Sequence, residues 1–291
     1  MADPLLNAMV GPYVLREMIS AGGIAEVYRA QHREDGRSYA VKVIRPERQA
    51  DKLHAKAFRE EFALLQRLAH PSIPKARRFD TVAGRACMVM DLIPGTTIHQ
   101  MRADRASFDA LEAFTKLTAS VAYLHANDVV HNDLKLENVI LRPDGSIGLV
   151  DFGNARVINR TGLFHRLLKR RPPVFGTPTY IAPELIAGEG RPTCQSDLYS
   201  LGVCCFIMLT GLPPFTHDRK SGRLRAAVSE TAPSIRSRVP SLSPAFARLI
   251  DLCLAKDPTQ RLDNAGHLQH AIKASLKSAG SGTAGIEPIE V

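Results

Sequence analysis

Residues 131–138 read "HNDLKLEN", a polar stretch between a predicted helix and the apolar run "VIL". Behind the histidine it carries Asp133, Lys135 and Asn138. An aspartate here can accept a proton from a hydroxyl, and a lysine can neutralise a phosphoryl group during its transfer. The asparagine offers a neutral oxygen of the kind that Mg²⁺ prefers. The stretch is therefore either a catalytic loop or only a polar turn, and its neighbours must decide.

The triplet "DFG" at 151–153 follows the apolar strand pattern "IGLV". Its Asp151 supplies a second oxygen ligand for a hard cation. Phe152 is an apolar anchor, and Gly153 gives the backbone freedom to turn. Asn138 and Asp151 together predict a site for a divalent metal ion.

A strand lysine and a helix glutamate stand upstream of this loop. Lys42 ends the triplet "AVK" in the middle of a predicted strand, where a lone lysine would be exposed and inert. Glu61 lies on the predicted helix that follows. A pair between the two side chains would aim the lysine at the α- and β-phosphates of a nucleotide.

A glycine turn, "ISAGGIAEVY" at 19–28, precedes both. Glycines allow a backbone to approach a phosphate and to donate N–H bonds to it. The same turn is also compatible with a simple hairpin, so it does not decide the function alone.

The pattern of apolar residues changes near residue 95. Before it, strands are predicted at 13–19, 25–32, 38–44 and 85–93, with one helix at 54–69. After it, helices are predicted at 108–128, 196–211, 244–257 and 264–277. The segment 151–184 has little periodicity, which is typical of a functional loop. A small β-rich lobe and a larger helical lobe are expected, with a ligand between them.

The 291 residues are 45% hydrophobic and carry a formal net charge of +9. Such a chain can bury a core, and its positive charge suits an anionic partner. Five cysteines without a C-x-x-C pair argue against a disulfide framework or a zinc site. We find no pattern of a secretory leader and no run that spans a bilayer, so we expect a cytoplasmic protein without a membrane span.

The ordered set of these motifs resembles the eukaryotic-type Ser/Thr protein kinase family, and within it the bacterial members. The resemblance runs from about Tyr13 to Ile272. It is strengthened by "GTPTY" at 176–180, "APE" at 182–184, "SDLYSLG" at 196–202 and "DPTQR" at 257–261. It implies an α+β, bilobal kinase fold. The predicted parts are an N-terminal extension (1–12), a kinase domain (13–275) divided into lobes at about residue 94, and a flexible tail (276–291).

The resemblance also implies a function and assigns roles to residues. The expected reaction is transfer of the γ-phosphoryl group of ATP to Ser or Thr hydroxyls of proteins, including the kinase itself, with Mg²⁺ or alternatively Mn²⁺. Asp133 and Lys135 would be catalytic, with Asn138 and Asp151 as metal ligands. The expected ATP-binding residues are Ile19, Ser20, Gly22, Gly23, Ala25, Val27, Ala40, Lys42, Glu61, Met90, Asp91 and Ile93.

Further residues would support these by the same resemblance. Val27 and Ala40 would enclose the adenine, Met90 would be the gatekeeper, and the backbone of 91–93 would bind the adenine edge. The expected structural residues are Asn132, Phe152, Gly153, Arg156, Thr177, Glu184, Asp197 and Arg261, with Leu65, His131 and Phe152 in one apolar column. Among them, Asp197 would hold the catalytic-loop backbone, Arg261 would pair with Glu184, and Thr177 would bond near Asp133 and Lys135.

Two departures from the family pattern carry predictions. Asn132 stands where the family has an arginine that binds a phosphorylated activation segment together with the basic residue at Arg156. A neutral asparagine cannot form that bidentate pair, so activity should depend little on such phosphorylation, although Thr161, Thr177 and Thr179 are possible acceptors. Ser20 and Ala25 replace two family glycines, and a serine forced to positive φ would cost roughly 1 kcal/mol.

Other readings remain open. The basic run "FHRLLKRRPP" at 164–173 is either a solvated loop or a docking site for an acidic partner. Ile207 stands where some kinases that prefer arginine-rich substrates carry a glutamate. A pseudokinase is the main alternative function, followed by a kinase of small molecules or lipids. A nucleic-acid-binding module comes last, because no motif supports it and nucleic acid is not expected as a partner.

Overall fold

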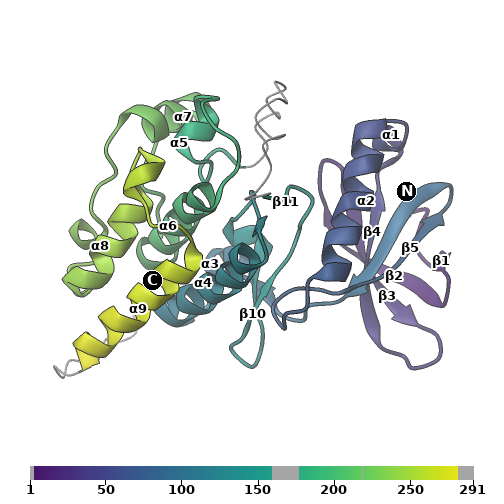
Figure 1. The fold of residues 1–291 in the computed structure, drawn as a ribbon. Helices are drawn as coiled ribbons and strands as arrows, with labels where there is room; N and C mark the ends of the chain where they lie inside the picture. Colours follow the sequence, from purple (N-terminus) through teal and green to yellow (C-terminus); the bar gives the residue numbers. More distant parts are fainter. Residues whose placement is uncertain (1–2, 159–176, 218, 281–291) are drawn as a thin grey trace. The chain divides into compact units, whose positions relative to one another are not determined.

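The computed structural model describes residues 3–158, 177–217 and 219–280. The chain divides into two compact units, Met1–Pro94 and Gly95–Val291 (Figure 1). Each unit is built around its own core, and each is described by itself below.

The first unit is a twisted antiparallel sheet with two helices. Its strands follow the order β1-β2-β3-β4-β6-β5. The elements are β1 (Met9–Val10), β2 (Tyr13–Ala21), β3 (Ala25–His32), β4 (Ser38–Ile44), α1 (Pro46–Gln49), α2 (Lys52–Arg67), β5 (Ala76–Val82) and β6 (Arg85–Asp91). The β5–β6 hairpin turns through Ala83 and Gly84, which are both at positive φ. A two-residue turn that matches the twist of the strands requires this conformation.

The two faces of this sheet carry different side chains. Side chains alternate between the faces along each strand, so Val41 and Val43 of β4 point one way and Lys42 the other. The face of Val41 and Val43 carries an apolar cluster that includes Leu5 and Val10 from the N-terminal segment. The described part of residues 1–12, the expected N-terminal extension, packs on this sheet and contributes β1.

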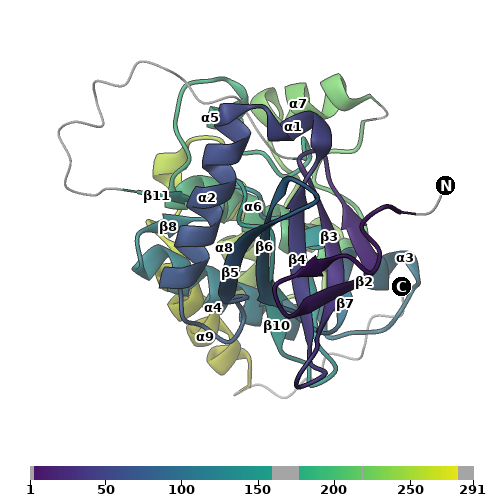
Figure 2. The same cartoon turned by 90° about the vertical axis from the view of Figure 1, so that its right-hand side faces the viewer.

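Helix α2 packs against the opposite face, the face of Lys42. Asp51 caps its N-terminus by accepting a hydrogen bond from the N–H of Leu53. Phe58 and Phe62 contact Phe79 of β5 with their rings edge-on, at centroid distances of 5.9 and 5.4 Å. Figure 2 shows α2 running along this sheet. The packing brings one side of the helix, with Glu61, over the strand that carries Lys42.

The second unit is mainly helical. Its helices are α3 (Ile98–Ala103), α4 (Ala110–Ala126), α5 (Pro183–Ile186), α6 (Cys194–Thr210), α7 (Lys220–Ser229), α8 (Pro244–Cys253) and α9 (Ala265–Gly280), with 3₁₀ turns at Leu136–Asn138, Ile235–Ser237 and Pro258–Gln260. Short strands pair as β10-β9-β7 and β11-β8, with β7 at Thr96–Thr97, β8 at Val129–Val130, β9 at Val139–Leu141, β10 at Ile147–Leu149 and β11 at Arg156–Val157.

Helix α6 is the centre of this unit. It begins with a capping box in which Thr193 and Ser196 bond each other's backbone N–H groups. It contacts both α4 and α8, and its residues 196–209 are all buried. Cys204 and Cys205 are buried in this helix, and the helix predicted at 196–211 is confirmed. Within the described ranges, none of the helices has the length and apolarity needed to cross a membrane.

Several element boundaries differ from the prediction. Helix α9 continues to Gly280, so residues 276–280, expected in a flexible tail, are helical. Helix α8 ends at Cys253 rather than at 257, and a 3₁₀ turn follows it. The aperiodic segment 151–184 contains β11 and the start of α5 in its described part.

Candidate active site

In the first unit, Lys42 and Glu61 form a close ion pair. The Lys42 Nζ donates to Glu61 Oε1 at 2.7 Å and to Oε2 at 2.9 Å. The lysine side chain is 13% exposed and the glutamate 3%. A shielded pair of this kind holds the ammonium group in one place instead of letting it move in water. The geometry is the one needed to present a fixed positive charge to phosphate oxygens.

Three other candidate residues of this unit, Val27, Ala40 and Met90, share the face of Lys42. In the strand register Val27 lies opposite Lys42, and Ala40 lies opposite Met90. Directly paired residues of antiparallel strands point to the same face, so these four side chains form one surface. Ala40, Met90 and the later Ile93 are buried. Apart from Lys42, the side chains of this surface are apolar.

The glycine turn is exposed and relaxed. The N–H of Gly22 donates to the carbonyl of Ala25 at 2.9 Å, which closes the hairpin. Ser20 belongs to β2, pairs with Val27, and is not among the described non-glycine residues at positive φ. The expected penalty of roughly 1 kcal/mol for a strained serine is therefore wrong. Ser20 has the extended backbone of a strand, which does not require a glycine.

In the second unit, the "HNDLKLEN" residues converge on Asp133. The Lys135 Nζ donates to Asp133 Oδ2 at 2.8 Å. The Asn138 Nδ2 donates to the backbone carbonyl of Asp133 at 2.9 Å, which directs the amide oxygen away from that carbonyl. Asp133 and Asn138 are both buried to more than nine-tenths. A carboxylate, an ammonium and an amide oxygen are thus held within one short loop.

Asp197 of α6 fixes the backbone of this loop from below. Its carboxylate is 1% exposed and accepts the N–H of His131 at 2.8 Å and the N–H of Asn132 at 2.9 Å. His125 of α4 bonds the same carboxylate through Nε2 at 3.1 Å, while its Nδ1 accepts the N–H of Ala265. The structure therefore contains the expected bonds from Asp197 to the loop, and it adds a bond from His125 to the same carboxylate.

The "DFG" triplet lies beside the same loop. Phe152 is buried, and its ring contacts that of His131 edge-on at 4.8 Å. Burial lowers the pKa of His131, and its Nε2 contacts the carbonyl of Val150 at 3.3 Å. Asp151 is at positive φ, an uncommon conformation that turns its exposed side chain out of the strand direction. Leu65 is buried in the first unit, and its place in a column with His131 and Phe152 stays a prediction.

Asn132 and Arg156 both bond the backbone near the triplet. The Asn132 Nδ2 contacts the carbonyl of Asn154 at 3.4 Å, and Asn132 itself is at φ 60°. The Arg156 Nη1 donates to the carbonyl of Ala155 at 2.7 Å and reaches that of Gly153 at 3.5 Å. The two side chains expected at a phosphate-binding position are thus joined to the loop after Phe152.

Glu184 and Arg261 form a bidentate ion pair, as expected. Arg261 Nη1 and Nη2 each lie 2.8 Å from a Glu184 oxygen. The guanidinium also donates to the carbonyls of Gln195, Ala255 and Lys256. Because each donor has a partner, this buried charge holds the start of α5 to the start of α6 and the end of α8.

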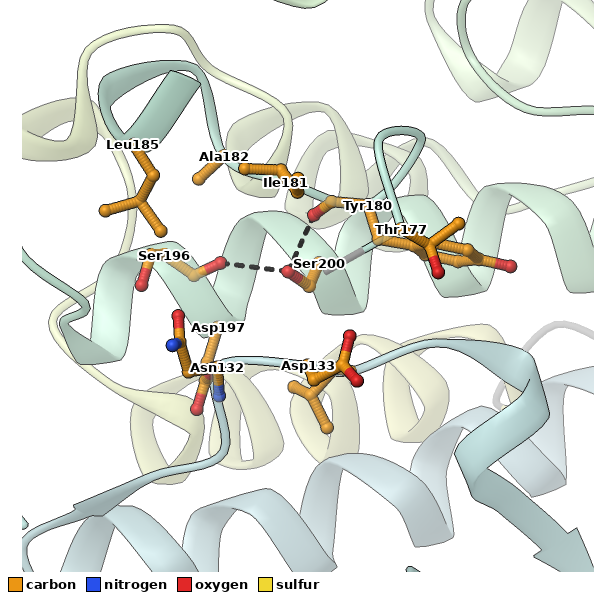
Figure 3. A pocket seen from close by; sticks show the side chains of 11 residues that line it. Asn132, Asp133, Thr177, Tyr180, Ile181, Ala182, Leu185, Ser196, Asp197 and Ser200 are labelled. Carbon is orange, nitrogen blue, oxygen red and sulfur yellow. Dashed lines mark hydrogen bonds between the residues drawn. The ribbon is translucent and has the colours of Figure 1, made fainter. Parts of the chain in front are cut away.

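A pocket opens next to Asp133. Its wall is formed by residues 132–134, the segment from Thr177 to Leu185 and the first turns of α6. Thr177 and Asp133 lie on facing sides of it (Figure 3). The expected hydrogen bond between Thr177 and the pair Asp133–Lys135 is not formed among the described residues, so Thr177 faces the pocket instead. Thr161 and the basic run 164–173 lie outside the described residues.

One polar contact of the first unit had no sequence signal. Arg77 of β5 forms a bidentate pair with the expected hinge residue Asp91, at 2.6 and 2.9 Å. Strand β5 itself was not predicted, because "ARRFDTV" is mostly polar and lacks an alternating pattern.

Comparison with known proteins agrees with this geometry. A family model described as "Protein kinase domain" matches residues 13–272. Serine/threonine-protein kinase PknJ of Mycobacterium tuberculosis is 33% identical over 283 residues, which are 91% of this chain and 45% of that protein. CBL-interacting protein kinase 25 of Oryza sativa is 28% identical over 258 residues, 86% of this chain and 49% of that protein.

A third relative is the probable serine/threonine-protein kinase PknB of Lactococcus lactis, 29% identical over 253 residues, 86% of this chain and 39% of that protein. The chain thus spans less than half the length of these curated relatives. The β-rich first unit and the helical second unit make up the bilobal protein kinase fold. The chain belongs to the protein kinase domain family, whose domain implies the use of ATP and a divalent metal ion.

Proposed function

We propose that this protein is a Ser/Thr protein kinase that transfers the γ-phosphoryl group of Mg-ATP to hydroxyls of protein substrates, including itself. The observation that carries the proposal is the set of charges held around Asp133 together with the shielded Lys42–Glu61 pair. Phosphoryl transfer needs little covalent chemistry from a protein, and depends on positioning and on stabilising charge. Both units supply groups of that kind.

Each residue then has a definite task. Lys42, held by Glu61, binds the α- and β-phosphates. Asp133 orients the acceptor hydroxyl and takes its proton, and its shielded carboxylate is suited to that role. Lys135, 2.8 Å from Asp133, stabilises the phosphoryl group during transfer. A hydroxyl that enters the pocket next to Asp133 is placed for attack.

The donor set on the second unit fits Mg²⁺. This ion is usually bound in proteins by one or two carboxylates together with phosphate oxygens and water. Asp151 supplies an exposed carboxylate, and Asn138 supplies an amide oxygen that its Nδ2 bond orients. When bound, the ion would neutralise charge on the phosphates. Mn²⁺ prefers similar oxygen ligands and is the alternative.

The test is a phosphorylation assay with purified protein, Mg-ATP and a mixture of protein substrates, read by mapping the phosphorylated residues. We expect phosphate on Ser and Thr side chains of the kinase and of other proteins. Lys42→Met and Asp133→Ala should each lower turnover by orders of magnitude, about 10²-fold or more, because they remove positioning and proton transfer. The folded fraction should be unchanged, as circular dichroism would show.

Matched variants control for the loss of a charge alone. Lys52→Met at the exposed start of α2 and Asp144→Ala in the exposed β9–β10 turn change the same residue types away from the site. Both should keep full activity. An unchanged rate in Lys42→Met or Asp133→Ala would contradict the assignment, and nucleotide binding without any phosphate transfer by the unaltered protein would identify a pseudokinase instead.

We also infer that activity depends little on phosphorylation of the activation segment. Asn132 is neutral, so it cannot form the bidentate contact that an arginine makes with a phosphate. Its side chain instead contacts the carbonyl of Asn154, and Arg156 donates to the carbonyl of Ala155. These bonds support the loop after Phe152 without a phosphate.

A further inference from the structure

Arg77 and Asp91 form a bidentate ion pair on the surface of the first unit. The Arg77 Nε donates to Asp91 Oδ1 at 2.6 Å, and its Nη2 donates to Oδ2 at 2.9 Å. Two parallel bonds of this kind fix the direction of a carboxylate as well as its position. Asp91 ends β6 and is the first residue of the expected adenine-binding hinge, followed by Leu92 and Ile93.

The backbone explains why Arg77 reaches this carboxylate. The ladder between β5 and β6 is regular from Val82 to Arg78 and then shifts its register between Arg78 and Ala76. Arg77 is the extra residue of that irregularity. A β-bulge turns the side chain of its extra residue away from the regular alternation, and bulges are frequent beside active sites. Here the arginine is directed along the sheet edge toward the end of β6.

The same stretch of β5 holds Asp91 by a second bond. The backbone N–H of Asp91 donates to the carbonyl of Lys75 at 3.0 Å. This bond and the bidentate pair both come from residues 75–77, so Asp91 is clamped at its amide and at its side chain. With the N–H already used, the carbonyl is the polar backbone group of Asp91 that remains to contact a base, and the clamp sets its direction.

We propose that Arg77 is a positioning residue for adenine recognition, which acts through Asp91 by fixing the first backbone carbonyl of the hinge. The proposal rests on the proposed function, because it requires that ATP binds along residues 91–93. A carbonyl fixed before the base arrives lowers the entropy lost on binding and favours a base that donates an amino hydrogen there. Arg77 therefore tunes affinity for the base and leaves the phosphates untouched.

The chain provides a matched control on the neighbouring residue. Arg78 pairs with Asp80 through its Nε at 2.6 Å, and the side chains of Arg77 and Arg78 are 46% and 49% exposed. Both arginines lie on β5 and both pair with an aspartate, but the Asp80 pair lies away from the hinge. A general effect of breaking a surface ion pair would appear equally in both positions.

The experiment compares Arg77→Gln, Arg77→Lys, Asp91→Asn, the double variant of Arg77→Gln with Asp91→Asn, and the control Arg78→Gln. The KM for ATP and kcat are measured, together with inhibition constants for adenosine and for magnesium tripolyphosphate. Adenosine reports on the base site and tripolyphosphate on the phosphate site. Exposed ion pairs have modest strength, so Arg77→Gln and Asp91→Asn should each weaken ATP and adenosine about two- to fivefold.

In the expected result, kcat stays within about twofold, tripolyphosphate binds as before and Arg78→Gln behaves like the unaltered protein. Affinities of Arg77→Lys for ATP and adenosine should lie between those of the unaltered protein and of Arg77→Gln, because lysine keeps the charge but cannot form the bidentate contact. The double variant should be no worse than either single one, since both remove one interaction. If Arg77→Gln does not fold, the measurements on Asp91→Asn and Arg77→Lys test the proposal instead.

The proposal would be overturned if Arg77→Gln did not change the inhibition constant for adenosine, or if it changed that for tripolyphosphate equally. It would also be overturned if Arg78→Gln had the same effect as Arg77→Gln. Additive effects in the double variant would also exclude an action through Asp91. If the unaltered protein binds neither ATP nor adenosine, the proposed function fails and takes this inference with it. Binding of ATP by the unaltered protein with no difference among the variants overturns the inference alone.

Discussion

The catalytic loop and the glycine turn are both proposed to contact reacting groups, yet they are held in opposite ways. The loop rests on buried bonds, with the Asp197 carboxylate accepting the N–H groups of His131 and Asn132. The turn is exposed from Ile19 to Ile24 and is held by bonds to its backbone, in which Gly22 donates to Ala25 and the carbonyls of Gly23 and Ile24 accept from Arg48 and Arg45. The first depends on specific side chains, whereas the second depends on a backbone shape.

This difference explains where the sequence can depart from its family. A buried donor that loses its partner cannot form a hydrogen bond with water instead. Each substitution in this network should therefore lower the free energy of unfolding. In the exposed turn, water can take the place of a lost contact, and Ser20 sits in ordinary strand geometry. Asn132 is intermediate, because its N–H bonds Asp197 whatever side chain it carries.

The largest expected effect comes from Asp197→Asn. Because His131 and Asn132 donate to different oxygens of Asp197, the NH₂ group of the amide would face one of these N–H donors and leave it without an acceptor. We expect a loss of about 3 kcal/mol in the free energy of unfolding, because buried unpaired donors cost about 1–3 kcal/mol each. Turnover should fall about 100-fold or more as the loop loses its geometry. Denaturant unfolding and steady-state kinetics measure the two quantities.

Asp257→Asn is the control for this variant. Asp257 is an exposed capping residue that accepts the N–H of Thr259, and because asparagine caps about as well as aspartate, Asp257→Asn should leave stability and turnover nearly unchanged. Equal effects of the two variants on stability and rate would mean that the buried network has no special role in the loop.

Asn132 tests the intermediate case. Asn132→Gly keeps a residue that tolerates φ 60° but removes the contact with the carbonyl of Asn154. We expect a loss of about 1 kcal/mol or less in stability, because a single hydrogen bond contributes about that much. Asn132→Ala should be worse than the glycine variant, since it adds a strained backbone. If Asn132→Ala were more stable than Asn132→Gly, the positive φ of residue 132 would have no effect on stability.

The phosphorylation inference is tested on the same residue. The unaltered kinase, treated with a phosphatase that is then removed, should keep most of its initial rate. Asn132→Arg should retain more activity before the treatment than after it, if an arginine restores a phosphate contact there. Loss of most of the unaltered protein's activity on treatment would show that the segment does need its phosphate.

Ser20→Gly should have the smallest effect. Its residue lies in β2 opposite Val27 and carries no positive φ, so a glycine gains no conformational benefit and only adds freedom to the unfolded chain. We expect less than about 1 kcal/mol of destabilisation and no more than about a twofold change in the KM for ATP. A tenfold improvement in the KM for ATP would show that the missing glycine does limit the phosphate contact.

The sequence predicted the elements whose burial is regular. Helices α2, α4, α6 and α9 follow the spacing of their apolar residues, and β2, β3 and β4 alternate or run apolar between turn signals. Strand β5 was missed because it is an edge strand with a bulge at Arg77, which interrupts the alternation. Helix α7 was missed because "KSGRLRAAVS" contains glycine and serine and has no apolar stripe.

The candidate site divides in the same way. The motifs gave the residue types, and the pairs Lys42–Glu61 and Arg261–Glu184 and the bonds of Asp197 are present in the structure. The contacts that the sequence could not give are those between a motif and an unremarkable residue, such as Arg77 with Asp91. These contacts depend on strand register and on bulges. The alternation of apolar and polar residues along one strand predicts neither of them.

The N-terminal segment has a practical consequence. Leu5 and Val10 cover the apolar face of the first sheet, and Asp3 accepts a hydrogen bond from the hydroxyl of Tyr28 at 2.9 Å. A shortened protein that starts at Tyr13, where the family match begins, would uncover that face and leave the edge of β2 unpaired. Exposed apolar patches and free strand edges promote aggregation, so such a fragment should be hard to keep in solution even though it contains every motif.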